Sequence, residues 1–138
     1  MILRFIEFLV RLFCRIIFRI EIIGTDNIPS DGACMVCANH QSNWDPVILL
    51  LFLKRKVHFM AKSELFENFF LGKLLKAEGV IPIKRGAADI QAVKASMEVL
   101  KSGNVLGMFP TGTRTKNIDS AEAKKGAALI ASRTGAYV

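Results

Sequence analysis

The sequence 33-ACMVCANHQSNWDP-46 passes from a buried strand through a polar loop into a helix. Residues 33–38 are apolar without alternation, which is typical of a strand that is buried on both faces. Pro46 suits the first turn of a helix, and we expect Asp45 at the N-cap of that helix. The polar loop 39–45 then follows the carboxyl end of a strand, where the sheets of α/β proteins present ligand-binding and catalytic groups.

The rest of the chain alternates between strand and helix patterns. We expect strands at 18–23, 57–61, 80–83 and 105–109, helices at 46–53, 64–76, 88–101 and 121–132, and the start of a further strand at Tyr137 and Val138. Strands that alternate with helices predict an α/β fold with a mixed, largely parallel sheet flanked by helices. Because the last residues begin a strand, we expect the domain formed by residues 24–138 to be incomplete at its C-terminus.

The first segment, residues 1–23, is rich in Ile, Leu, Phe and Val, but charged residues interrupt it. These charges recur at helical spacing and form one stripe along a helix: Arg4, Glu7, Arg11, Arg15 and Arg19. Arg11 would lie near the middle of a membrane-spanning helix, which is unfavourable, and no small-residue cleavage site follows for a secretory signal. The pattern favours an amphipathic helix at the membrane interface, and packing on the domain core is the alternative.

The composition restricts the class of partner. Hydrophobic residues make up 51% of the chain, and the formal net charge is +7. A basic protein binds nucleic acid, an anionic membrane or a phosphorylated substrate, and the charge alone does not choose among these partners. A nucleic-acid-binding domain is disfavoured because the cations are spread along the chain and do not interleave with the aromatic residues.

Three cysteines, Cys14, Cys34 and Cys37, do not suggest a disulfide framework. No second pair of Cys or His stands at zinc-site spacing from Cys34 and Cys37, so we expect plain core cysteines and no metal. The stripe of apolar residues at 65–76 is expected to pack on the sheet, with contact to lipid as the alternative. Trp44 fits either a membrane-interface anchor or a loop packing residue.

His40 and Asp45 are the candidate catalytic residues of the polar loop. In a loop that doubles back, the carboxylate can orient the imidazole and stabilise its charged form. The other ring nitrogen can then take a proton from a substrate hydroxyl. The spacing alone is a weak signal, because a helix-capping Asp and a loop His with a backbone partner give the same pattern.

Two further segments place cations after a predicted strand. Residues 79–85 end in Lys84 and Arg85, and residues 109–116 combine Gly112 and hydroxyl groups with Arg114. Arginine binds phosphate oxygens through a planar fork, and backbone amides near a glycine can complete an anion site. Taken singly, residues 79–85 are better explained as a solvated strand end, and residues 109–116 as an ordinary turn.

Together, the three segments resemble the glycerolipid acyltransferase family. The first block of that family, N-H-x-S-x-x-D, is matched by Asn39, His40, Ser42 and Asp45. The second block, a glycine followed by apolar residues and a final Arg, is matched by residues 79–85. The third block, F-P-E-G-T-R, is matched by residues 109–114 except at Thr111, and a family-like K-x-E-L stretch begins at Lys62.

The resemblance implies an enzyme that moves a fatty acyl group from acyl-CoA or acyl carrier protein to the sn-2 hydroxyl of lysophosphatidic acid. His40 would act as general base, oriented by Asp45, and no metal or bound cofactor is implied. The phosphate of the acceptor would be held by residues of the later blocks and their neighbours: Lys62, Lys84, Arg85, Gly112, Thr113 and Arg114. The expected location is the cytoplasmic face of a membrane, as a peripheral or monotopic protein.

The chain departs from the family pattern in two ways. Thr111 replaces the usual Glu of the third block and removes a carboxylate from the acceptor site. The fourth block of the family, an apolar strand centred on a proline, would follow Val138. A catalytically inactive lipid-binding relative, truncated or degenerate, is therefore the alternative hypothesis.

Overall fold

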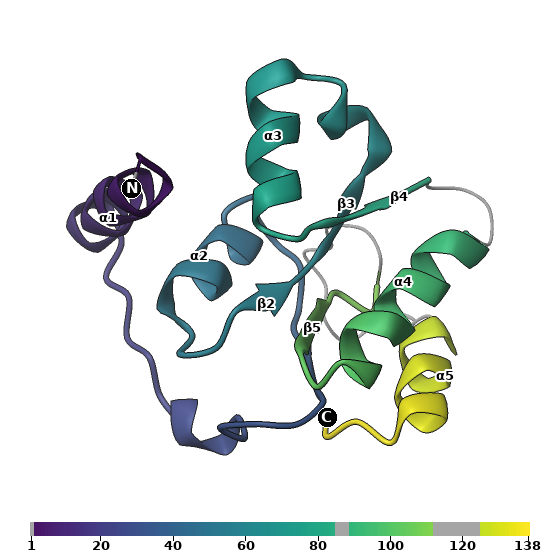
Figure 1. Cartoon of the computed structure of the whole chain (residues 1–138). Coiled ribbons are helices and arrows are strands. Elements are labelled where there is room, and N and C mark those ends of the chain that lie inside the picture. The colour runs from purple at the N-terminus through teal and green to yellow at the C-terminus, as the bar shows by residue number, and fades with distance from the viewer. Residues whose placement is uncertain (1, 85–88, 112–124) are drawn as a thin grey trace.

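The structure, a computed structural model, describes residues 2–84, 89–111 and 125–138. Helices and strands alternate along the chain after the first helix, as the sequence predicts (Figure 1). The helices are α1 (Ile2–Ile17), α2 (Asp45–Phe52), α3 (Phe69–Ala77), α4 (Ile90–Lys101) and α5 (Lys125–Thr134). The strands are β1 (Cys34–Cys37), β2 (Val57–His58), β3 (Met60–Lys62), β4 (Ile81–Ile83) and β5 (Val105–Met108), and short 3-10 turns η1 and η2 lie at Thr25–Asn27 and Ser63–Phe66.

The described strands pair in parallel, in the order β1-β5-β2 and, separately, β3-β4. The central strand β5 is buried along its whole length, as expected for a strand that is covered on both faces. Tyr137 forms a parallel bridge with Cys34 on the free edge of β1, which confirms the predicted start of a strand. The strand expected at 18–23 is wrong, because this segment has no regular structure and links α1 to η1.

The core has two parts, one on each face of β5. Leu106 and Met108 belong to a cluster with residues of α4 and α5, whereas Val105 belongs to a second cluster with Phe59. Alternate residues of a strand point to opposite faces, so one short strand contributes to both clusters. Figure 1 shows α4 and α5 side by side on one side of the strands and α1 with α2 on the other.

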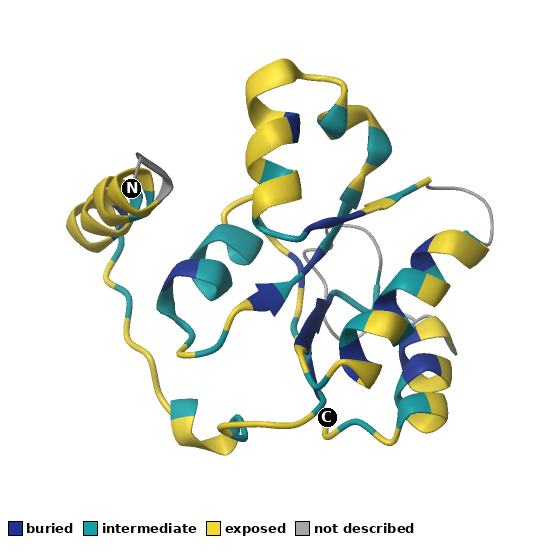
Figure 2. Cartoon of the chain, viewed as in Figure 1, coloured by how far each residue is buried: buried dark blue, intermediate teal, exposed yellow. Residues whose placement is uncertain are grey.

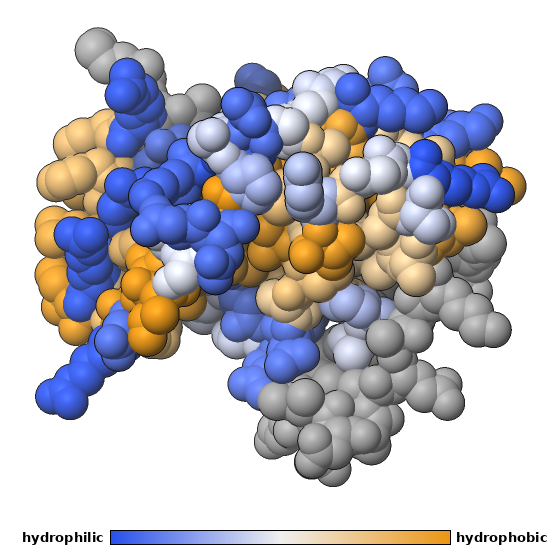
Figure 3. All heavy atoms as spheres, turned by 90° about the horizontal axis from the view of Figure 1, so that it is seen from below, coloured by the Kyte–Doolittle hydropathy of each residue, from blue (hydrophilic) through white to orange (hydrophobic). Residues whose placement is uncertain are grey.

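The helix α1 contacts the domain and also leaves a broad apolar face uncovered. Cys14 is fully buried, whereas Phe5, Phe8 and Ile16 are 60–73% exposed. Figure 2 shows the exposed length of α1, and Figure 3 shows hydrophobic atoms gathered at the edge of the molecule where α1 lies. Among helices in the described ranges, none has the length and apolarity needed to span a bilayer.

The expectation that the 65–76 stripe packs on the sheet is wrong. The predicted helix is broken into η2 and α3, and Asn68 caps α3 by accepting hydrogen bonds from the amides of Phe70 and Leu71. Gly72 faces inward against the Phe66 carbonyl, where a side chain would not fit. With Gly72 on the inner face, the ring-bearing side of α3 points to solvent, and Phe69 and Phe70 are 67% and 82% exposed.

The prediction of two core cysteines in β1 is half wrong. Cys34 is buried and Cys37 is exposed. Burial decreases along β1 towards its carboxyl end, so the last residue of the strand emerges from the core next to the polar loop.

Arg55 connects two distant turns, and its loss should destabilise the fold. Its guanidinium donates to the carbonyl oxygens of Pro29, at 2.9 Å, and Gly103, at 2.7 Å. We expect Arg55→Met to lower the free energy of unfolding by about 2 kcal/mol, because two partly buried carbonyls lose a charged donor. Urea denaturation measures the change. Lys54→Met is the matched control, since Lys54 pairs with Asp26 in solvent and should contribute little; equal stability of the two variants would contradict the prediction.

Candidate active site

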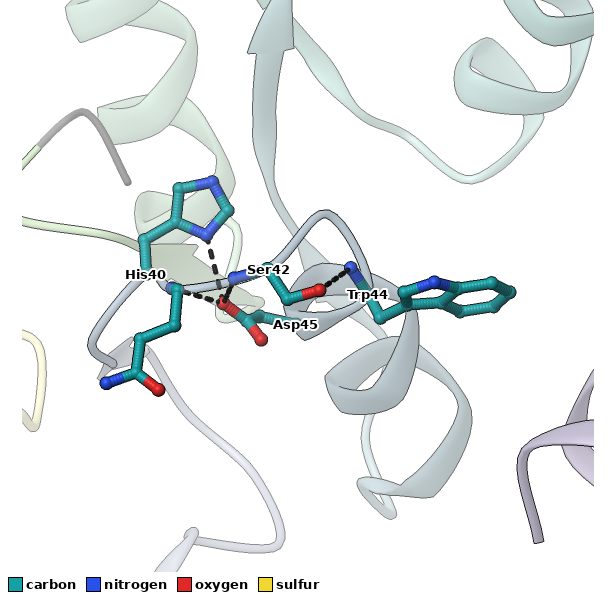
Figure 4. Close-up of polar contacts among 5 residues, drawn as sticks. His40, Ser42, Trp44 and Asp45 are labelled. Atoms are coloured by element: carbon teal, nitrogen blue, oxygen red, sulfur yellow. Dashed lines mark hydrogen bonds and ion pairs between the residues drawn. The ribbon is translucent and has the colours of Figure 1, made fainter. Parts of the chain in front are cut away.

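His40 and Asp45 meet across the loop between β1 and α2, as the sequence suggests. His40 Nδ1 lies 3.1 Å from Asp45 Oδ2. Figure 4 shows the other ring nitrogen of His40 pointing away from the carboxylate. His40 is buried, with 9% of its surface exposed, so its ring is held in the protein and not on a mobile surface loop.

Asp45 is positioned by the loop that it closes. Its Oδ2 atom also accepts hydrogen bonds from the amides of Gln41 and Ser42, both at 2.8 Å. Burial of the carboxyl opposes ionisation, but the hydrogen bonds from Ser42, Gln41 and His40 outweigh it and lower the pKa of Asp45. The carboxylate therefore stays charged beside the imidazole, where it can stabilise an imidazolium ion.

The expectation that Asp45 is the N-cap of α2 is wrong by one residue. The N-cap is Trp44, and Asp45 is the first residue of the helix. The Asp45 side chain bonds to the amides of the preceding loop, so that it organises this loop and not the first turn of α2.

Ser42 and Trp44 connect this loop to the N-terminal segment. The hydroxyl of Ser42 accepts a hydrogen bond from the amide of Trp44 at 3.2 Å. The Trp44 ring lies 5.9 Å from the rings of both Phe13 and Phe18, measured between centroids. Of the two predicted roles for Trp44, the structure shows packing, and the packing partner is the N-terminal segment.

Phe109 covers one face of the His40 ring, a contact that the sequence did not indicate. The two rings are stacked with centroids 4.3 Å apart and an interplanar angle of 24°. The cause of this contact is the parallel register of β1 and β5, which pairs Cys37 with Met108 and so brings Phe109 to the end of the sheet that carries His40. This register depends on tertiary pairing, so local sequence patterns could not predict it.

The predicted phosphate-binding residues are only partly described. Lys62 and Lys84 are both exposed, and both lie at the carboxyl end of the β3-β4 pair, in which Lys62 is opposite Ile83. The amide of Lys84 donates to Asp89 at 2.8 Å, a contact not anticipated from the sequence. Asn39 is exposed and Thr111 is half-buried, whereas four predicted residues lie outside the described residues: Arg85, Gly112, Thr113 and Arg114.

In the described part of the chain, no group of His, Cys, Asp and Glu side chains is arranged to hold a metal ion. The chemistry that the described residues can perform is proton transfer. A buried imidazole, fixed at Nδ1 by an ionised carboxylate, is arranged to take a proton at its other nitrogen.

Comparison with known proteins gives one family. The acyltransferase family profile matches residues 19–138. The 1-acyl-sn-glycerol-3-phosphate acyltransferase of Bacillus subtilis is 34% identical over 114 residues, which cover 81% of this chain and 56% of that protein. The enzyme of the same name from Streptococcus pneumoniae is 42% identical over 111 residues, which cover 78% of this chain and 40% of that protein.

A solved structure has the same fold. The crystal structure of the 1-acyl-sn-glycerophosphate acyltransferase from Thermotoga maritima superposes with a TM-score of 0.69 and 31% sequence identity, covering 82% of this chain and 45% of that chain. This chain thus spans about half the length, or less, of these relatives.

Proposed function

The chain belongs to the acyltransferase family, and from this premise we propose that the protein transfers a fatty acyl group to the sn-2 hydroxyl of 1-acyl-sn-glycerol-3-phosphate, giving phosphatidic acid. The observation that carries the proposal is the 3.1 Å contact between Nδ1 of the buried His40 and Asp45 Oδ2, in the loop at the end of β1. The names of the relatives support the choice of acceptor.

In the proposed mechanism, His40 takes the proton of the sn-2 hydroxyl. The hydroxyl oxygen attacks the thioester carbonyl carbon of acyl-CoA or acyl carrier protein, the carbon–sulfur bond breaks, and the proton passes from His40 to the leaving thiolate. Asp45 holds the imidazole in one tautomer and stabilises its transient positive charge. The acyl donor is a substrate, and the reaction as written uses no resident cofactor.

We assign the acceptor phosphate to cations at the end of β3 and after β4 and β5. Lys62 and Lys84 are exposed at the end of the β3-β4 pair, where a phosphate can approach them from solvent. Arg85, Arg114 and the amides of Gly112 and Thr113 complete this proposed set on the strength of the family motifs. Phosphate oxygens accept from both lysine and arginine donors, and arginine adds bidentate geometry.

The proposal is tested with the complete protein in a membrane fraction. Acyl-CoA and acylated acyl carrier protein, each labelled in the acyl group, are offered in parallel. Each donor is tested with lysophosphatidic acid and with lysophosphatidylcholine as acceptor. We expect labelled phosphatidic acid from lysophosphatidic acid and little product from the zwitterionic acceptor, because a phosphate monoester is the group that the cations hold. If the fraction forms no more phosphatidic acid than membranes without the protein, the proposal is wrong.

One observation favours a second candidate function, a membrane lipid-binding protein without turnover. Thr111 occupies the position where the family motif usually carries Glu, so the acceptor site lacks a carboxylate. A Thr111→Glu variant distinguishes the two functions. Phosphatidic acid formation that appears only after this substitution identifies the natural protein as the inactive relative.

We further propose that α1 binds the cytoplasmic face of a membrane through its uncovered apolar side. Leu12→Asp combined with Ile16→Asp should reduce binding to vesicles of phosphatidylethanolamine and phosphatidylglycerol by roughly tenfold or more, since two side chains lose apolar burial. These residues are 46% and 73% exposed, so the domain core is not disturbed. Co-sedimentation measures the change, with Ile90→Asp, on a 64% exposed residue of α4, as the control. Equal binding by both variants would count against an α1 anchor.

A further inference from the structure

We propose that Phe109, whose ring also stacks on Phe59, is a positioning residue for His40. The inference rests on the proposed function, because it assigns the stack a part in the proton transfer. Asp45 fixes only Nδ1 of the imidazole, at 3.1 Å. A single hydrogen bond leaves the ring able to tilt about that contact, and a tilt displaces the nitrogen that must reach the substrate hydroxyl.

The Phe109 ring removes this freedom on one face. Its centroid lies 4.3 Å from that of His40, and the planes differ by 24°. A tilt of the imidazole towards Phe109 would bring the two rings into collision, and a tilt away would give up their contact. The negative face of an aromatic ring also favours a cation beside it, so the stack helps to stabilise the imidazolium that forms when His40 takes a proton.

Phe109 is itself held in place by the core. Its ring stacks on Phe59, with centroids 5.7 Å apart and an angle of 18° between the planes. Phe59 is 2% exposed and follows β2 directly. Three rings are therefore stacked in a row, from the buried Phe59 through Phe109 to the His40 imidazole. We call these three rings the aromatic column.

Gly107 of β5 makes room for the base of the aromatic column. A Cβ atom at this position would lie 2.2 Å from Cε1 of Phe59, which is far inside contact distance. A glycine in a strand interior lacks a packing side chain and often marks a place where another group approaches closely. Here the group that approaches is the Phe59 ring, so Gly107→Ala must push the aromatic column towards or away from His40 without altering any residue of the catalytic pair.

The first experiment reads the His40 ring directly and needs no turnover. The chain has two histidines, so selective labelling gives His40 and His58 as the two ring signals. The ring current of Phe109 should shift the His40 ring protons upfield in the natural protein. Phe109→Leu should abolish that shift, Phe109→Tyr should keep it, and the His58 signals should not move. If the His40 signals are the same in Phe109→Leu and in the natural protein, the stack does not exist in solution and the proposal is overturned.

The second experiment measures catalysis in the complete protein. Phe109→Leu should lower kcat by about 10- to 100-fold with KM for the acceptor nearly unchanged, since a misplacement of about 1 Å can cost about 100-fold. Phe109→Tyr should restore most of the rate, and Gly107→Ala should lower it with the same unchanged KM. Leu53→Ala, in the same apolar cluster as Phe109, is the control for general destabilisation.

The outcomes separate this proposal from the proposed function. If Leu53→Ala lowers kcat as much as Phe109→Leu at the same loss of thermal stability, the effect of Phe109 is only structural and the positioning role is rejected. If the natural protein forms no phosphatidic acid, the proposed function fails and the catalytic role of the stack is rejected with it. In that case the ring signals still decide whether Phe109 holds His40.

Discussion

Replacing His40 with alanine is expected to lower kcat by about 100- to 10,000-fold, the range over which a positioned general base contributes. The variant keeps the hydrogen bonds from the amides of Gln41 and Ser42 to Asp45, so the loop retains most of its geometry. KM for the acceptor should change little, because the cations assigned to its phosphate are untouched. Steady-state formation of phosphatidic acid from labelled acyl donor measures both constants.

His58→Gln is the matched control for the loss of a histidine. His58 lies on β2, and its Nδ1 atom is 3.0 Å from the Gly79 carbonyl oxygen, a contact that a glutamine amide can replace. This variant should keep its rate within a few-fold of the natural protein. Activity of His40→Ala equal to that of His58→Gln would show that His40 is not the base.

Replacing Asp45 with asparagine should lower kcat by a similar factor for a different reason. The asparagine oxygen can still accept from the loop amides, but the neutral side chain no longer stabilises an imidazolium and can favour the wrong tautomer of His40. The loss should therefore appear in kcat and leave acceptor binding nearly unchanged. Asp26→Asn, at an exposed surface ion pair with Lys54, serves as the control; an equal loss of rate in the two variants would contradict the assignment.

Asp45→Asn should also change how strongly the free energy of unfolding depends on pH in acid. The pKa of Asp45 is lowered from its ordinary value of 3.8 because the hydrogen bonds to the carboxylate outweigh its burial. A carboxyl with a lowered folded pKa contributes stability that is fully present above the unfolded pKa and is lost as the pH falls through the folded pKa. The free energy of unfolding should therefore fall less for Asp45→Asn than for the natural protein as the pH is lowered below about 4. Urea titrations across that range measure the difference, and parallel curves would contradict it.

The order of strands and helices could be predicted because the residues that face the core form apolar patterns within short stretches of sequence. The run Val105-Leu106-Gly107-Met108 is apolar throughout, and it becomes the central strand β5. The orientation of α3 could not be predicted in this way. An apolar stripe at helical spacing normally faces a core, but the break at Asn68 and the inward Gly72 set α3 so that Phe69 and Phe70 face outward.

The contact between His40 and Asp45 could be predicted from residue types in one loop, because the two residues are close in sequence. The aromatic column could not, because it joins residues that are distant in the chain. His40, Phe59 and Phe109 meet only after β5 has paired with β1 on one side and β2 on the other. The sequence shows Gly107 only as an isolated glycine in a strand, and this does not identify Phe59 as the ring that packs against it.

The contact of Trp44 with Phe13 and Phe18 has a consequence for the reaction cycle. These rings join the loop that carries His40 to α1 and the segment just after it. With α1 lying in the interface as proposed, this contact places the His40 loop beside the membrane surface. On the proposed function, we expect the glycerol of a lysolipid to reach His40 while the lipid tail stays in the leaflet. The proposed reaction then needs no extraction of the acceptor from the bilayer, and we expect lateral diffusion to deliver it.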